Sequence, residues 1–142
     1  MAFVYNRGKT NVGTVWDWDD PGTPFRLMLV TSTYVYDADH NVRSDITNEI
    51  TNTGYTSGGD AITARAVSQN DATNEAEYDG ADLTFAGIDA GDQPAAAIVY
   101  RDTGAAATDD LVCYLSLSAA AAPDGSPYQI LFDAAALFKI TD

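Results

Sequence analysis

Basic residues are scarce in this chain. Lysine and arginine together number 7 against 21 aspartates and glutamates, and the formal net charge is −14 at pH 7. Nucleic acids and anionic membranes are polyanions, so this charge argues against a protein that binds either by nonspecific attraction. Two explanations of the acidity stay open, adaptation to high salt and a loop-rich β-domain in which Asp serves turns.

Cysteine and histidine occur once each, at Cys113 and His40. One cysteine permits no disulfide within the chain, and we expect a buried, inert thiol on the strand face that carries Leu111, Leu115 and Leu117. A single histidine supplies neither a zinc triad nor a catalytic pair, and no G-x-S-x-G or Cys-His signature is present. We therefore predict no enzyme, no metal and no cofactor.

Long apolar runs and targeting features are also missing. No stretch is long and apolar enough for a transmembrane helix, and the N-terminal MAFVYNRGKT lacks the features of a secretory signal. A length of 142 residues with 46% hydrophobic content suits one core. We expect one soluble domain over residues 1–142, made in a cytoplasm.

One acidic segment looks like the start of a calcium-binding loop, because Asp37, Asp39 and Asn41 alternate as its first ligands do. Such a loop needs Gly at its sixth position and a bidentate Glu at its twelfth, where this chain has Val42 and Asn48. We interpret the segment as a solvated acidic turn, and weak calcium binding at the other acidic loops stays open.

Period-two alternation of apolar residues is the main structural signal. It predicts a central strand over Phe25–Ser32, from which a long polar excursion leaves and returns near Ile62. Within the excursion, Ser44–Thr51 could form one or two helical turns. Phe3–Tyr5 is expected to be a short edge strand or an arm lying on a neighbour. Further strands are expected at Val12–Trp18, Ile62–Ser68, Asn74–Tyr78, Asp82–Phe85, Ala95–Arg101, Leu111–Ser118, Tyr128–Asp133 and Ala136–Ile140.

Short strands separated by turn signals at regular intervals are typical of sandwiches. The sequence therefore predicts an all-β fold, a single-domain β-sandwich of jelly-roll or Greek-key type with one long loop excursion.

Aromatic residues could form an exposed face near the N-terminus. Trp16 and Trp18 lie two apart on an expected strand, and Tyr34 and Tyr36 would extend their face. Flat amphipathic rings supply contact area for stacking a sugar or for a protein interface. Core packing on one sheet is the alternative explanation.

Four segments carry a recognisable pattern. They are VTSTY (Val30–Tyr34), DITNEITNTGYTSGG (Asp45–Gly59), VYRDTGAAATDDLVCYLSLS (Val99–Ser118) and YQILFDAAALFKIT (Tyr128–Thr141). With them the chain resembles small β-rich virion structural proteins of tailed bacteriophages, over most of its length from Phe25 onward. The earlier segment WDWDDPG differs from that pattern.

The resemblance implies a virion protein of the capsid surface, a decoration or cement protein that binds the major capsid protein on the outside of the head. Members of that class are often trimeric, so a homo-oligomer is expected. The alternative is a tail or baseplate component that acts as a carbohydrate- or receptor-binding module. Residues 1–10 are a possible interface arm, and the Asp45–Gly59 loop is expected at another interface or on the outer surface. The candidate interface residues are Phe3, Tyr5, Trp16, Trp18, Tyr34, Tyr36 and Tyr55.

Overall fold

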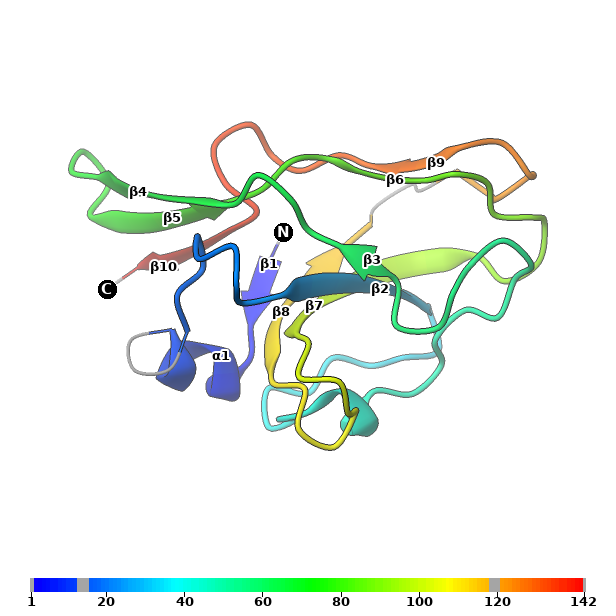
Figure 1. The fold of residues 1–142 in the computed structure, drawn as a ribbon, viewed down its shortest axis with the longest axis horizontal. Coiled ribbons are helices and arrows are strands. Elements are labelled where there is room, and N and C mark those ends of the chain that lie inside the picture. Colours follow the sequence, from blue (N-terminus) through cyan, green and yellow to red (C-terminus); the bar gives the residue numbers. More distant parts are fainter. Residues whose placement is uncertain (1, 13–15, 118–120, 142) are drawn as a thin grey trace.

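The computed structural model describes residues 2–12, 16–117 and 121–141, which fold into two layers of antiparallel strands (Figure 1). The first layer is a five-stranded sheet with the order β1-β8-β7-β2-β3. This order differs from the order along the chain, so the chain leaves the sheet and returns to it. The strands, taken across the sheet, are β1 (Ala2–Val4), β8 (Leu111–Ser116), β7 (Pro94–Arg101), β2 (Phe25–Thr31) and β3 (Asp60–Ala61).

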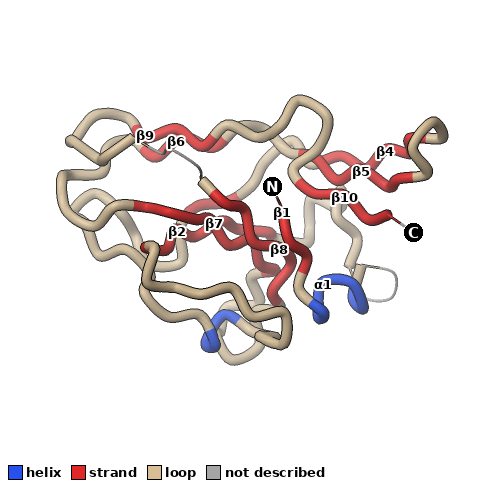
Figure 2. Tube along the Cα trace, turned by 180° about the vertical axis from the view of Figure 1, so that it is seen from behind, coloured by secondary structure: helices blue, strands red, loops and turns tan. Residues whose placement is uncertain are grey.

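The second layer is a three-stranded sheet β10-β5-β4 and a two-stranded ribbon β6-β9, side by side above the first sheet in Figure 2. Because β5 pairs with β10 and β6 with β9, the two parts form one long antiparallel ribbon with a break. At the break, residues 80–82 on one side face the longer segment 131–137 on the other. The strands are β4 (Ala66–Asn70), β5 (Glu75–Asp79), β6 (Leu83–Phe85), β9 (Tyr128–Ile130) and β10 (Phe138–Thr141).

The predicted all-β sandwich is confirmed, and the alternation along β2 explains how its layers pack. Leu27 and Leu29 enter the hydrophobic core between the two layers, while Met28 and Val30 enter a second cluster on the outer face. Strand β7 behaves in the same way, with Val99 in the first cluster and Ile98 in the second. Both faces of the central strands are therefore buried.

The long excursion covers the outer face of the five-stranded sheet and runs below it in Figure 1. Its Tyr34 is buried there, and Tyr36 and Ile46 pack against the same cluster. The helix predicted over Ser44–Thr51 is wrong, because the only helical turn in this stretch is the 3₁₀ turn η1 (Arg43–Asp45). The chain then runs extended beside β2, where the N–H of Ile50 donates to the carbonyl of Leu29 at 3.1 Å.

The strand predicted over Val12–Trp18 is also wrong. A short helix, α1 (Asn6–Asn11), precedes this stretch, residues 13–15 lie outside the described part, and Trp16 and Trp18 belong to a loop. The loop is held from a distance, because the guanidinium of Arg65 donates to the carbonyl oxygens of Trp18, Asp20 and Thr23 at 2.7 to 2.8 Å. These hydrogen bonds hold residues 18–23 in a loop, so this stretch does not form a strand that pairs with β2 as a hairpin.

The prediction that Cys113 shares a strand face with Leu111 is wrong, because a bulge interrupts the pairing of β7 with β8. The β7–β8 register shifts between Val99 and Tyr100, so Leu111 points into the outer cluster while Cys113 and Leu115 face the core between the layers. Cys113 has no exposed surface, and burial raises the pKa of its thiol. The expected burial of the thiol is confirmed, but Leu111 does not share its face.

Candidate functional site

The aromatic residues proposed for an interface fall on opposite faces of the five-stranded sheet. Trp16 and Trp18 lie between the layers, with 7% and 2% of their surfaces exposed. Both indoles pack on Phe25, at ring-centre distances of 5.9 and 4.6 Å. They fill the core, as the packing alternative predicts, and do not form an exposed aromatic face.

The other face carries an aromatic cluster of Phe3, Tyr5, Tyr34, Tyr36 and Tyr114. Phe3 on β1 stands opposite Tyr114 on β8, and Tyr36 from the excursion packs 5.3 Å from Phe3 and 5.5 Å from Tyr114. The structure thus joins four of the candidate interface residues and adds Tyr114. The sequence offered one signal for it, an aromatic residue in a predicted strand.

Hydrogen bonds hold most of the aromatic cluster in place. The buried Tyr5 and Tyr34 hydroxyls lie 3.0 Å apart, and the Tyr34 hydroxyl is 2.9 Å from His40 Nδ1. Burial raises the pKa of both phenols, so they stay protonated and can donate. The Tyr36 hydroxyl donates to the carbonyl of Val4. Among the five residues of the cluster, Phe3 is the exposed one, with 41% of its surface open to a partner.

Tyr55 lies apart from the aromatic cluster, and its hydroxyl forms hydrogen bonds that hold the excursion against β2. Its hydroxyl accepts a hydrogen bond from the N–H of Leu29 at 3.0 Å and donates to Glu49 at 2.8 Å. The Glu49 carboxylate also accepts from the Ser57 hydroxyl and the Gly58 N–H. The Asp45–Gly59 loop therefore folds around the Glu49 carboxylate. The hydroxyl and N–H groups that bind this carboxylate are used within the loop and are not offered to a partner.

A buried ion pair closes the same side of the molecule. Arg43 donates to Asp109 at 2.7 Å, and Asp109, with no exposed surface, also accepts from the N–H and hydroxyl of Thr103. Burial alone would raise the pKa of Asp109, but the bonds from Thr103 and Arg43 outweigh it and lower the pKa. This arrangement ties the excursion to the β7–β8 connection and stabilises the fold.

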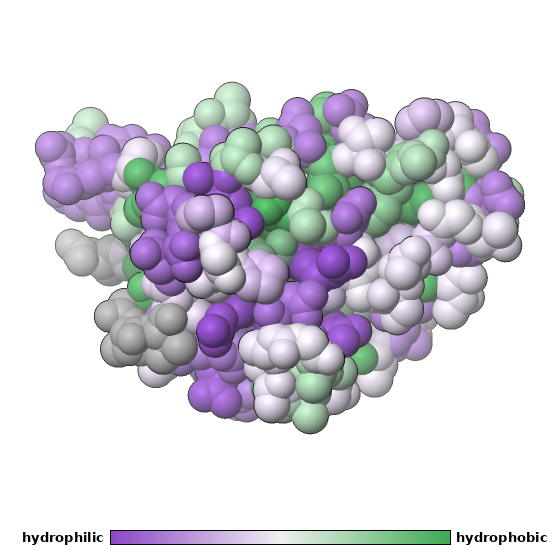
Figure 3. All heavy atoms as spheres, viewed as in Figure 1, coloured by the Kyte–Doolittle hydropathy of each residue, from purple (hydrophilic) through white to green (hydrophobic). Residues whose placement is uncertain are grey.

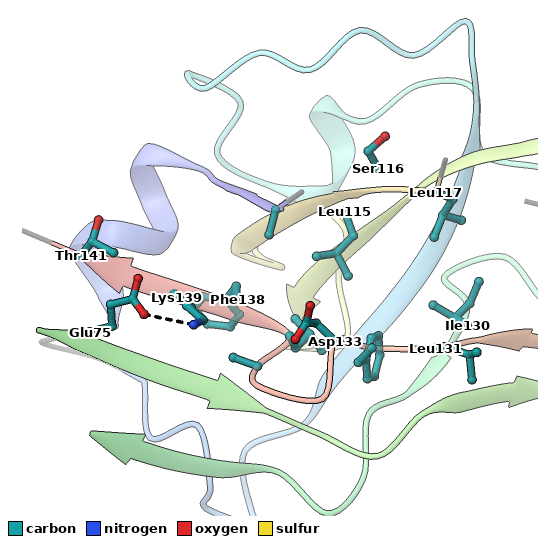
Figure 4. Close-up of a pocket in the computed structure, with 14 residues that line it drawn as sticks. Glu75, Leu115, Ser116, Leu117, Ile130, Leu131, Asp133, Phe138, Lys139 and Thr141 are labelled. Atoms are coloured by element: carbon teal, nitrogen blue, oxygen red, sulfur yellow. Dashed lines mark hydrogen bonds and ion pairs between the residues drawn. The ribbon is translucent and has the colours of Figure 1, made fainter. Parts of the chain in front are cut away.

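An open groove lies on the other side, between the layers, where β8 faces β10 (Figure 4). It has a volume of about 720 Å³ and continues into a hollow of about 310 Å³ along β9, with Leu117, Ile130 and Leu131 common to both. We call the two together the edge groove. Its apolar lining includes Ala2, Leu115, Leu117, Ile130, Leu131 and Phe132.

The break in the second layer produces the edge groove. Segment 131–137 is longer than the facing 80–82, so it bows away from the ribbon and leaves the side chain of Leu131 68% exposed. Its ends are fixed, since the N–H of Phe132 donates to Asp82 and the N–H of Leu137 to the Tyr78 carbonyl. Sequence reasoning missed this site, whose only signal was an apolar Leu-Phe pair in a short predicted strand.

Strand edges border the edge groove. Within the described part of the chain, β10 pairs only with β5, β9 only with β6 and β1 only with β8, so each is the last strand of its sheet. Edge strands offer N–H and C=O groups to a further strand. Ala2 lines the groove while its neighbour Phe3 belongs to the aromatic cluster, so the two surfaces flank the same edge strand.

No family model matches this chain, and no curated protein or solved structure matches it. The described residues contain no helix suited to crossing a membrane and no group of three metal-binding side chains. In the Asp37–Asn41 segment, the carboxylate of Asp37 accepts from the N–H of Asp39, as an acidic turn requires. The edge groove and the exposed Phe3 ring are thus the surfaces from which a function can be inferred.

Proposed function

We propose that this chain is a virion structural protein of a tailed bacteriophage, a decoration or cement protein that binds the outside of the head. One observation carries the proposal. The edge groove and the exposed Phe3 ring lie on the two faces of one edge strand, β1, and the edge strands β9 and β10 border the groove, whereas Arg43 and Asp109 on the excursion side bind each other. Apolar surface beside free strand edges suits protein docking.

The sequence pattern and the charge support the same proposal. The segments with the phage-virion pattern include Asp45–Gly59, which builds the closed loop around Glu49, and Tyr128–Thr141, which builds the groove wall. Figure 3 shows a largely hydrophilic surface over the β4–β5 hairpin and the lower part of this face. A net charge of −14 repels packaged DNA and leaves the protein shell as the partner, here the major capsid protein.

The carbohydrate- or receptor-binding alternative loses its main support. It used Trp16 and Trp18 as a stacking platform, and both indoles are buried under Phe25. Residues 1–10 are likewise less suited to an arm than expected, because β1 pairs with β8 and Tyr5 is fully buried. The docking role of the N-terminal segment therefore reduces to the exposed Phe3 ring.

The test is to measure the mass of the isolated protein by light scattering and then to sediment it with emptied, undecorated heads of the phage that encodes it. We expect a trimer that co-sediments near stoichiometrically. Phe3→Ala should weaken attachment, and Val67→Ala, at an exposed apolar site on β4, should not. A protein that stays in the supernatant contradicts the proposal and redirects the question to tails and glycans.

A further inference from the structure

The edge groove has the form of a site for an extended chain. Its two hollows share three residues and follow β9 and β10 in succession, so the apolar surface runs along the strands. In Figure 4, Leu115 on β8, Leu117 just after this strand, and Ile130 and Leu131 from the second layer surround the opening. A strand placed there would direct alternate side chains into this lining.

The backbone beside the groove is suited to pairing. β10 is the last strand of its sheet among the described residues, and its residues Phe138, Lys139 and Thr141 line the groove. Lysine on an edge strand commonly discourages pairing. Here Lys139 cannot act in this way, because its ammonium group lies 3.0 Å from both Glu75 and Glu77 on β5.

The charge around the groove selects the occupant. Among the described residues that line the two hollows, Lys139 is the only cation, and the acidic side chains are Glu75, Asp133 and Asp124. Lys139 is already neutralised by its two glutamates. A second copy of a chain with net charge −14 would be repelled, whereas a segment with Lys or Arg would be attracted.

We infer that the edge groove binds an extended segment of the partner protein, apolar at alternate positions and flanked by Lys or Arg, which adds as a strand beside β10. This inference rests on the proposed function and deepens it, since it states how the shell protein is held. Main-chain hydrogen bonds to β10 supply affinity, and the apolar hollows and acidic rim supply selectivity.

The probe is a library of fluorescein-labelled decapeptides that alternate Lys with Val, Ile, Leu, Phe or Tyr, measured by fluorescence anisotropy with the full chain. We expect the best peptide to bind Leu131→Gln about tenfold more weakly than the unaltered protein. Val67→Gln is the control, because Val67 on the edge strand β4 is, like Leu131, an exposed apolar residue but lies outside the groove. It should leave the affinity unchanged.

Strand addition is distinguished from simple charge attraction by the peptide backbone. N-methylation at alternate residues removes donors but keeps the charge, and it should weaken binding about tenfold if a strand forms. Addition of the unmodified peptide should also slow hydrogen exchange at β10 amides. A library without any binder, equal affinity for Leu131→Gln, or indifference to N-methylation overturns the inference.

The same variants separate this inference from the proposed function. If heads bind the protein and Leu131→Gln alike, the decoration function stands and the groove is not the docking site. If a peptide binds with the expected preferences and heads do not, the groove site stands and the partner is not the head. If Leu131→Gln loses binding to both the heads and the peptide, and Val67→Gln loses neither, the result supports both the decoration function and the groove site.

Discussion

The excursion and the edge groove lie on opposite sides of the five-stranded sheet, and they differ in whether their polar and apolar groups have partners within the molecule. On the excursion side, the carboxylates of Glu49 and Asp109 each accept several hydrogen bonds from neighbouring chain segments. On the groove side, Leu131 and three strand edges stay open. We call the excursion side the closed side because these carboxylates are satisfied within the molecule, although Val35 of the excursion is 78% exposed. The open side arises where regular pairing of strands is interrupted.

The largest effect is expected from breaking the closed side at Asp109. Asp109→Asn removes the charge that Arg43 binds at 2.7 Å and places an amide donor against the guanidinium. Loss of one partner of a buried pair should lower the free energy of unfolding by about 3 kcal/mol. Urea titration measures the change, and Asp71→Asn at the exposed β4–β5 turn is the control, expected within about 0.5 kcal/mol.

Acid should weaken the same contact. The pKa of Asp109 is lowered in the folded state, so its stabilising contribution is complete above the ordinary carboxyl pKa and is lost as the pH falls through the folded value. We expect stability to fall below about pH 4, and to fall less steeply in Asp109→Asn. Urea midpoints at a series of pH values test this, and parallel profiles for the two proteins would contradict it.

Gly59 gives the next largest effect, where the excursion returns to the sheet. Its φ is +67°, and a Cβ atom there would lie 1.7 Å from the Leu27 carbonyl oxygen. Gly59→Ala should cost about 3 kcal/mol, combining backbone strain with a clash that requires β2 to shift. Gly104→Ala separates the two causes, because Gly104 has φ +90° but open space around it, and should cost only about 1 kcal/mol.

A smaller effect is expected at Glu49. Glu49→Gln keeps the size of the side chain but puts an amide where the carboxylate accepts from Tyr55, Ser57 and Gly58. A loss of about 1 to 2 kcal/mol follows from weaker, partly reversed hydrogen bonds. Thermal unfolding of Glu49→Gln, of Tyr55→Phe and of the double variant measures this loss. If the losses of stability in the two single variants simply add in the double variant, the two groups act separately and the prediction is contradicted.

The smallest effect on stability is expected on the open side. Leu131 is 68% exposed, so Leu131→Gln should change the free energy of unfolding by less than about 0.5 kcal/mol. The same substitution is expected to weaken binding at the edge groove. A large loss of stability would show that Leu131 supports the fold, and the contrast between the closed and the open side would then fail.

Much of the regular structure was predictable from local pattern. Strands β2, β7 and β8 follow long apolar runs, and their predicted positions agree with the structure within two residues. The loop at Trp16 and Trp18 was mispredicted because alternating Trp and Asp imitate a half-exposed strand. What decides that loop is Arg65, more than forty residues away in sequence, which local pattern does not reveal.

The candidate site was predictable only in part. Phe3, Tyr5, Tyr34 and Tyr36 were singled out as aromatic residues, and the structure brings them together through strand pairing and the path of the excursion. The edge groove could not be foreseen, because it depends on which residues face segment 131–137. That pairing joins β5 and β6 to strands 43 to 66 residues later in the chain, and no periodicity of the sequence indicates it.

Cys113 gives this chain a built-in reporter. The thiol lies on β8 between the layers with no exposed surface, so a thiol reagent reaches it only when β8 separates from its neighbours. The rate of modification therefore measures how often this side of the sandwich opens, without an added label. A strand seated in the edge groove would hold the two layers together and slow that reaction.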